Sequence, residues 1–375
     1  MNPQISTIDL LQLASGDRLS IQVYKFIGAK PGKKAYIQAN LHGCEIVGNA
    51  VIYQLIEFLL NLDTSQIKGE IWLVPVCNPL SANQRDHFFS TGRFNSYDGK
   101  DWNRIFWDYE KECDRLESFA KSQIDMPQLT IRKNFLQQIK QALKQQLKQI
   151  ESQTSLPYYF HYRYQLQSLC LDANYVLDIH SSSNQGIDYI YCFKTREDSA
   201  KYFLLDRGIL MSEYDGDAFD EAFMKSWLAL ERKLAELGKE IKFDIESWTI
   251  ELGSGMEMKP ESVKTGVKGI KNYLIAKEML EIPDYSPIES QIKLVAKHQI
   301  AKYYAPAGGM IQERACLGSI VKSGDRLYQI LSFNKRGELP TVKEISAEKD
   351  GLVFDVSTNQ AVNQGEYVIS TIDDE

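Results

Sequence analysis

The sequence predicts an α/β protein in which helices cover a sheet, followed by a smaller all-β domain. Short β-branched and apolar runs alternate with longer segments whose apolar residues recur every three or four positions, the pattern of strands alternating with helices. Pro283 and Pro287 then interrupt helix and strand alike, and from residue 291 onward apolar and polar residues alternate between turn signals. We therefore expect a first domain at residues 1–285 and a second at residues 291–375.

The elements of the first domain follow from the spacing of apolar residues. Three segments have helical spacing, at residues 45–60, 218–237 and 261–280. In the first of them Ile52, Ile56 and Leu59 follow one another at steps of four and three residues, which would place one face on the sheet. The predicted strands are six apolar runs, at residues 19–26, 35–40, 71–76, 175–179, 189–193 and 248–252.

A polar segment rich in Gln, Lys and Glu, at about residues 108–172, is predicted to be a helical insertion. Within it, residues 134–151 carry Leu136, Ile139 and Leu143 at helical spacing. Two interpretations stay open, a lid or dimerisation arm and a pair of solvated surface helices. The composition favours the second, because such helices need no partner to be stable.

The C-terminal segment, residues 291–375, resembles a biotinyl/lipoyl-like β-sandwich. Its two halves are alike, and each ends in a Val-x-x-Gly turn, at Val321 and at Val362. A carrier domain of this kind would present a modified lysine, but Lys335 lacks the flanking residues of such hairpins. A structural cap is therefore the favoured interpretation.

Composition excludes several classes of partner and site. The formal net charge of −7 argues against nucleic acid, and six cysteines without CxxC pairs are typical of reduced thiols rather than of a disulfide framework. Residues 1–21 lack the apolar run of a signal peptide, and no stretch approaches the about 20 apolar residues of a membrane span. We expect a cytoplasmic protein with a small-molecule substrate and no membrane partner, and homo-oligomerisation stays open.

Residues 40–45, Asn-Leu-His-Gly-Cys-Glu, close a predicted strand and open a predicted helix. His42 and Glu45 would flank the connecting loop, where an i, i+3 pair can direct an imidazole nitrogen and a carboxylate oxygen at one zinc ion. Alone the pair is a weak signal. A hydrogen-bonded loop histidine and a first-turn glutamate favoured by the helix dipole are the plain alternatives.

A second candidate ligand ends the hydrophobic run at residues 175–180. His180 lies at a strand end, where open α/β sheets place their sites. Asp178 either orients a ligand or substrate group or is a strand-end carboxylate bound to backbone amides, and both interpretations stay open. Two histidines and one glutamate with a vacant fourth position are typical of a catalytic zinc, with one ion per chain.

Glu251 is the candidate base. It lies within the apolar run Thr-Ile-Glu-Leu-Gly, where an unpaired charge is costly. The expected role is to take a proton from the attacking water and pass it to the leaving amine.

The segment at residues 93–104 supplies the cations that an anion site in an acidic protein must gather locally. Arg93 is predicted to stabilise the oxyanion that forms when water attacks an amide carbonyl. Asn103 and Arg104 are predicted to bind a substrate carboxylate through paired hydrogen bonds. For any single arginine, a surface salt bridge is the plain alternative.

Taken together and in this order, HGCE, NP, RFNSYDGKDWNR, LDIH and TIELG resemble the succinylglutamate desuccinylase/aspartoacylase family, which is related to the zinc carboxypeptidases. The resemblance spans about residues 30–280 and implies a mixed sheet of the zinc-carboxypeptidase type. Trp102 stands where the family usually has Leu, and the insertion is long for the family, which puts the substrate in doubt more than the chemistry. The family's zinc ligands, general base and substrate-binding residues fall on His42, Glu45, His180, Glu251, Arg93, Asn103 and Arg104.

The predicted function is zinc-dependent hydrolysis of the amide bond of an N-acyl amino acid or related small molecule. A zinc carboxypeptidase acting on short or modified peptides is an alternative, because it would use the same residues. A non-catalytic metal- or ligand-binding protein is an alternative of another class. It would be expected to lack a ligand or the base, whereas all four positions are retained.

Overall fold

The computed structural model describes residues 1–87, 90–112, 115–150, 156–333 and 335–373. Within these ranges the centre is a nine-stranded sheet with the order β1-β2-β4-β3-β5-β9-β7-β8-β10. The pairs β3/β4, β3/β5 and β5/β9 are parallel, whereas β7 runs antiparallel to β9, so the sheet is mixed. Its strands are β1 Gln4–Gln12, β2 Arg18–Ile27, β3 Lys30–Ala39, β4 Lys68–Val74, β5 Tyr175–Ser182, β7 Tyr189–Phe193, β8 Arg207–Met211, β9 Glu246–Ser254 and β10 Lys293–Ala296.

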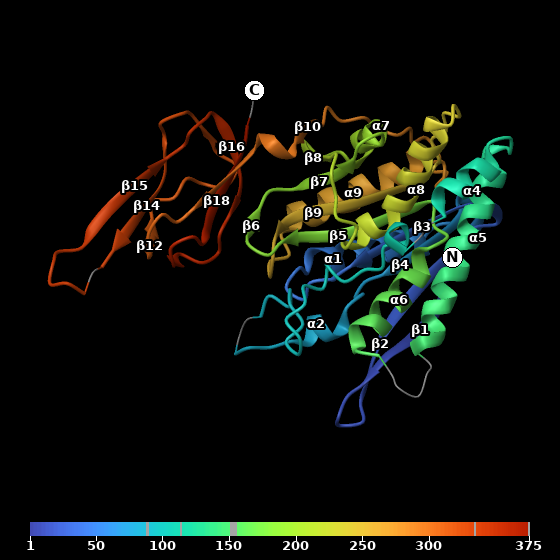
Figure 1. Cartoon of the computed structure of the whole chain (residues 1–375), viewed down its shortest axis with the longest axis horizontal. Coiled ribbons are helices and arrows are strands. Elements are labelled where there is room, and N and C mark those ends of the chain that lie inside the picture. Colours follow the sequence, from blue (N-terminus) through green and yellow to red (C-terminus); the bar gives the residue numbers. More distant parts are fainter. Residues whose placement is uncertain (88–89, 113–114, 151–155, 334, 374–375) are drawn as a thin grey trace.

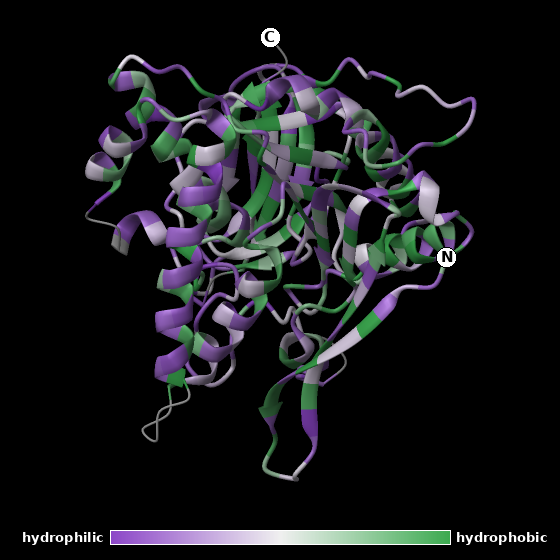
Figure 2. Ribbon diagram, turned by 90° about the vertical axis from the view of Figure 1, so that its right-hand side faces the viewer, coloured by the Kyte–Doolittle hydropathy of each residue, from purple (hydrophilic) through white to green (hydrophobic). Residues whose placement is uncertain are grey.

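Helices cover both faces of this sheet. The alternation of side chains along β3 assigns them, since Ile37 packs in one apolar cluster with α1 and α9, and Tyr36 packs in another with α5, α6 and α8. Figure 2 shows hydrophobic residues concentrated along the central strands and mixed with hydrophilic ones along the surrounding helices. The helices are α1 Val47–Leu60, α2 Pro79–Asn83, α3 Tyr109–Glu112, α4 Leu116–Gln123, α5 Gln128–Ile150, α6 Tyr158–Cys170, α7 Glu197–Ala200, α8 Phe219–Glu236 and α9 Pro260–Ala276, with short 3-10 turns at Thr64–Gln66, Lys201–Phe203 and Lys297–Gln299.

The segment predicted as a helical insertion contains α3 to α6, with residues 113–114 and 151–155 outside the described ranges. Helix α5 is part of the main core. Its buried stripe consists of Ile131, Phe135, Ile139 and Leu143, and the ring of Phe135 lies 5.1 Å from that of Trp227 on α8. The i, i+4 spacing of this stripe is the reason that one face of a largely polar helix is buried.

Beyond the large sheet, the chain forms two small sheets, which lie to one side of the helices in Figure 1. Strand β10, the first after the expected boundary at residue 291, pairs with β8 and completes the large sheet. Strand β6, Gln185–Gly186, projects from the large domain and pairs with β16. One small sheet contains β11 Ile300–Tyr304, β18 Tyr367–Asp373, β16 Gly351–Val356 and β13 Ile320–Val321, and the other contains β15 Thr341–Ser346, β14 Arg326–Ser332, β12 Gly309–Gln312 and β17 Ala361–Val362.

The predicted fold class is confirmed, because a mixed sheet covered by helices is followed by antiparallel β-structure. None of the helices in the described ranges combines the length and the apolar character that a bilayer crossing requires. Cys113 lies outside the described residues, and the other cysteines, Cys44, Cys77, Cys170, Cys192 and Cys316, are free thiols.

Candidate metal centre

The candidate site lies where three parallel neighbouring strands end. His42 follows the end of β3, His180 lies near the end of β5, and Glu251 lies on β9 directly opposite His180 in the strand register. The carboxyl ends of parallel strands meet at one edge of a sheet, so residues far apart in the sequence converge there.

The loop that carries His42 is shaped by its own polar residues. Asn40 adopts a left-handed conformation, with φ of 67°, and its Nδ2 donates to the backbone oxygens of His42 at 3.1 Å and Gly43 at 3.2 Å. A Cβ on Gly43 would lie 2.2 Å from the Ser81 backbone oxygen, so this position requires glycine. Asn78, of the NP motif, donates from Nδ2 to the Leu41 backbone oxygen at 3.0 Å. These contacts fix the loop before α1 begins.

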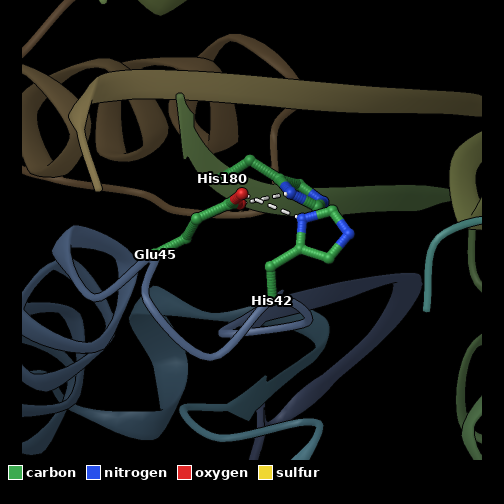
Figure 3. A group of neighbouring side chains, drawn as sticks. All are labelled: His42, Glu45 and His180. Atoms are coloured by element: carbon green, nitrogen blue, oxygen red, sulfur yellow. Dashed lines mark hydrogen bonds and ion pairs between the residues drawn. The ribbon is translucent and has the colours of Figure 1, made fainter. Parts of the chain in front are cut away.

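His42, Glu45 and His180 form one compact buried cluster (Figure 3). Nδ1 of His42 lies 2.9 Å from Oε1 of Glu45, and Nδ1 of His180 lies 2.8 Å from Oε2. One donor atom from each residue lies within 4.8 Å of the others. The side chains are 2%, 2% and 4% exposed, so the cluster is shielded from bulk water.

Each imidazole is also held on its far side by a carboxylate. Nε2 of His180 lies 2.9 Å from Oδ2 of Asp178, whose Oδ1 accepts a hydrogen bond from Gln38 at 3.0 Å. Nε2 of His42 lies 3.3 Å from Oδ1 of Asp101. Of the two interpretations of Asp178, this geometry matches the one in which it orients His180, because a carboxylate on one ring nitrogen leaves the other as a metal donor.

The charges inside the cluster shift its pKa values in opposite directions. Burial opposes the shift, but the Asp178 and Glu45 carboxylates raise the pKa of His180 well above its ordinary value, and Glu45 and Asp101 raise that of His42. Burial likewise opposes the fall in the pKa of Glu45, which both imidazoles lower. The pKa of Asp101 is lowered to about 2, because the His42 hydrogen bond and the Arg93 charge outweigh burial.

The donor set suits a divalent transition metal. Two imidazole nitrogens and one carboxylate are the protein ligands of many catalytic zinc sites, which leave a further position for water or substrate. Both Nδ1 atoms face the Glu45 carboxylate, so one donor atom of each histidine points toward the same carboxylate. Since zinc binds neutral imidazole, both Nδ1 atoms would have to be unprotonated when they bind the ion.

Glu251 lies beside the cluster. Its Oε2 atom is buried and has no hydrogen-bond partner among the described residues. Burial raises the pKa of Glu251 to about 7, with a further rise from the Glu45 charge and an opposing effect of His180 and His42. A carboxyl group that exchanges its proton near neutral pH is suited to general acid and base chemistry.

The predicted substrate-binding residues have different surroundings. Arg93 lies next to the cluster, with Nε 3.0 Å from Oδ2 of Asp101 and Nη1 3.5 Å from the Ser183 hydroxyl. Asn103 is buried, and its Oδ1 accepts the backbone N–H of Phe219 at 2.9 Å, which ties this loop to α8. Arg104 is exposed and donates to the Asn103 backbone oxygen at 2.6 Å. The structure thus brings Arg93 to the cluster and places Arg104 at the surface.

Three residues that contact the cluster or its neighbours were not predicted as site residues from the sequence. Asp101 belongs to the motif that contains Asn103, and its contact with His42 depends on the path of a loop. Ser183 donates to Oε1 of Glu45 at 3.0 Å. Of the three, only Gln38 could have been identified from the sequence, because a polar residue within an apolar strand indicates a buried hydrogen bond.

Similar proteins place these observations in context. The sequence profile of the succinylglutamate desuccinylase/aspartoacylase catalytic domain matches residues 31–276. A curated relative is the N-alpha-acetyl-L-2,4-diaminobutyric acid deacetylase of Halomonas elongata, 25% identical over 206 residues; the match covers 52% of this chain and 55%, about half, of that enzyme.

Solved structures are similar over nearly the whole chain. A protein of Shewanella frigidimarina assigned as a succinylglutamate desuccinylase/aspartoacylase is 25% identical with a TM-score of 0.89, covering 100% of this chain and 98% of its own. A protein of the same assignment from Shewanella amazonensis is 27% identical with a TM-score of 0.86 and 98% coverage of both chains.

The fold and the cluster define a mixed α/β protein that gathers imidazole and carboxylate groups at the carboxyl edge of its sheet. The chain belongs to the succinylglutamate desuccinylase/aspartoacylase family, because the match to the catalytic domain spans more than half of its length.

Proposed function

We propose that the protein is a zinc-dependent deacylase that hydrolyses the amide bond of an N-acyl amino acid or a related small molecule. The observation that carries this proposal is the convergence of His42, Glu45 and His180 beside Glu251, whose Oε2 atom is buried and has no hydrogen-bond partner in the part of the chain that the structure describes. Family membership and the curated deacetylase relative support the reaction class.

His42 and His180 would bind the ion through Nδ1, and Glu45 through its carboxylate. Asp101 and Asp178 hold the two Nε2 atoms and so keep the rings oriented. When bound, zinc supplies a Lewis acid that polarises the scissile carbonyl and makes water more acidic.

Glu251 is the proposed base. It would accept the proton of the attacking water on Oε2 and then donate it to the leaving amine, which exits as a neutral amine with a carboxylic acid as the other product. A pKa of about 7 supports both halves of this transfer, because the group can take up and release a proton near neutral pH.

Arg93 is proposed to stabilise the negative charge that develops on the carbonyl oxygen, and Asn103 with Arg104 to bind a substrate carboxylate. Arg93 is suited to its role because Asp101 fixes Nε while the Arg93 side chain as a whole is 34% exposed. For Arg104, an exposed guanidinium would have to turn toward the substrate. This part of the proposal is tested by the dependence of KM on the substrate carboxylate.

The decisive variant is Glu251→Gln in the zinc-loaded protein, assayed against a panel of N-acyl amino acids by release of free amine. We expect zinc content to stay at one ion per chain and kcat to fall by about 10²–10⁴-fold, because an amide cannot transfer the proton. Glu257→Gln is the matched control, since Glu257 is exposed in the loop after β9 and pairs with Lys259 at 3.6 Å.

A fully active Glu251→Gln protein would end the assignment of the base. A wild-type protein that releases amino acids stepwise from peptides, and no amine from the acylated panel, would favour the carboxypeptidase instead. A protein that binds zinc and hydrolyses neither class would fit a non-catalytic binding protein.

A further inference from the structure

We infer that Asp355, in the C-terminal β-structure, is a positioning residue for the metal centre, acting through Ser182. The inference rests on the proposed function, because it concerns the geometry of the same cluster. It assigns to the C-terminal sheets a specific task, which is to hold the segment that follows His180.

Ser182 lies at a junction of three parts of the site. It is two residues beyond His180 on β5, and its backbone oxygen accepts the N–H of Gly255 at 2.6 Å, which fixes the end of the strand that carries Glu251. Its hydroxyl donates to Oδ2 of Asp355 at 2.5 Å. Ser182 therefore connects β5, which carries His180, with β9, which carries Glu251, and with the C-terminal sheet that contains Asp355.

The neighbours of Ser182 touch the metal ligands directly. The backbone N–H of Ser181 lies 3.4 Å from Oε2 of Glu45, and the Ser183 hydroxyl donates to Oε1 of Glu45 at 3.0 Å. Ser183 also accepts from Arg93 at 3.5 Å. Any displacement of Ser182 would consequently move two groups that orient the Glu45 carboxylate.

Asp355 is itself firmly placed. Its Oδ1 accepts a hydrogen bond from the Tyr367 hydroxyl at 2.5 Å, and Tyr367 lies on β18, the strand next to β16. On the other side, β6 pairs with β16 so that Gly186 stands opposite Asp355. The Asp355 carboxylate thus accepts one hydrogen bond from its own sheet, from Tyr367, and one from the large domain, from Ser182. The bond from Ser182 lies beside the backbone pairing of β6 with β16, which joins the large domain to the small sheet.

Attachment of the small sheets to the large domain does not require the Ser182–Asp355 hydrogen bond. The apolar cluster of Tyr189, Ile209, Val295, Phe354 and Ile372 already packs the two parts together. The Ser182–Asp355 bond adds a polar contact two residues from a metal ligand, where small shifts alter how tightly an ion is bound.

The test is a double-mutant cycle on zinc affinity, measured by competition with a chelator, with Ser182→Ala, Asp355→Ala and the double variant. Each single variant should weaken zinc binding by roughly tenfold, the lower end of the effect of outer contacts to ligands. The double variant should be no weaker than the weaker single one, because both changes break the same bond. Ser332→Ala is the matched control, since it loses a hydroxyl bond to the Gly308 backbone oxygen, 2.8 Å long, within the other small sheet.

Unchanged zinc affinity in Ser182→Ala, or effects that simply add in the double variant, would overturn the inference. Ser182→Ala alone decides the matter if Asp355→Ala does not fold. A protein that binds zinc, shows the coupling and hydrolyses no acyl amino acid would refute the proposed reaction and leave the positioning role intact. A wild-type protein that binds no zinc would refute both.

Discussion

The two imidazoles of the cluster are held with unequal firmness. Asp178, which contacts His180, is fully buried and receives a second hydrogen bond from Gln38. Asp101, which contacts His42, is 16% exposed and shares its other oxygen with Arg93. Of the two histidines that we propose as metal ligands, His42 is therefore the one whose orientation depends most on a single loop contact.

Asp101→Asn should weaken zinc binding by about 10–100-fold, because an amide is a poorer acceptor for Nε2–H and no longer balances the Arg93 charge. Zinc affinity measured by chelator competition checks this. Asp98→Asn in the same loop is the control, since Asp98 accepts only a local backbone bond from Lys100 at 3.1 Å among its described contacts. Equal zinc affinity in the two variants would show that Asp101 does not orient His42.

The sequence predicts the central residues of the site because their positions depend on strand ends. His180 ends an apolar run, His42 follows the end of another, and Glu251 lies one residue before the end of a third; neighbouring parallel strands bring these positions together. The contacts of Asp101, Ser182 and Asp355 cannot be predicted in this way. Their contacts are determined by a loop and by the docking of a separate sheet, and neither has a periodic signal in the sequence.

At the scale of elements, a buried carboxyl group joins α8 to β9, the strand that carries Glu251. Asp220, in the first turn of α8, accepts the Thr249 hydroxyl at 2.8 Å, and Thr249 lies two residues before Glu251 on β9. Burial, with the nearby Glu221 charge, raises the pKa of Asp220 to about 6. The helix is thus tied to the strand by a carboxyl group whose raised pKa lets it keep its proton to a higher pH than an exposed aspartate.

Asp220→Asn should change the pH dependence of stability. The folded protein holds the Asp220 proton more tightly than the unfolded chain, so the stabilisation is complete below about pH 4 and is lost as pH rises through about 6. Asn stays neutral throughout. The unfolding free energy of the variant should therefore gain on the wild type by up to about 3 kcal/mol between pH 4 and pH 7, and no further above that.

Denaturant unfolding across this pH range measures the difference directly, and the interval from pH 7 to pH 8 provides the internal control. A difference that does not vary with pH would mean that Asp220 titrates alike in the folded and unfolded chains.

The sequence also predicts most elements of the large sheet, and the exceptions have a physical cause. The six predicted runs correspond to β2, β3, β4, β5, β7 and β9. The other three strands are β1, β8 and β10. Strands β1 and β10 lie at the two edges of the sheet, and β8 and β10 are short with half-buried patterns, so none of the three presents a continuous buried apolar run. Helix α5 was predicted as a helix, but its polar composition concealed the Phe135 stripe that packs on α8.

For the molecule as a whole, the main question is how firmly the two small sheets are attached. The ring of Phe354 on β16 lies 5.8 Å from that of Tyr189 on β7 at an interplanar angle of 85°, and Phe354 is 5% exposed. Because Tyr189 stands opposite Glu251 in the register, this contact packs against β7, the strand that pairs with β9 at Glu251. The packing of the small sheets and the surroundings of Glu251 therefore share the Tyr189 side of the sheet.

Phe354→Ala should loosen this attachment at a cost of about 3–5 kcal/mol, the usual range for a buried phenylalanine. Since the same cluster belongs to both parts, we expect the wild type to unfold in one calorimetric transition and the variant in two, with the small sheets unfolding first. Phe333→Ala is the matched control, because Phe333 is 67% exposed at the end of β14 and should leave the transition in place. Two separate transitions in the wild-type protein, or identical traces for the two variants, would mean that Phe354 does not couple the sheets to the catalytic domain, and the positioning of Ser182 would then depend on the Asp355 bond and the β6 ladder alone.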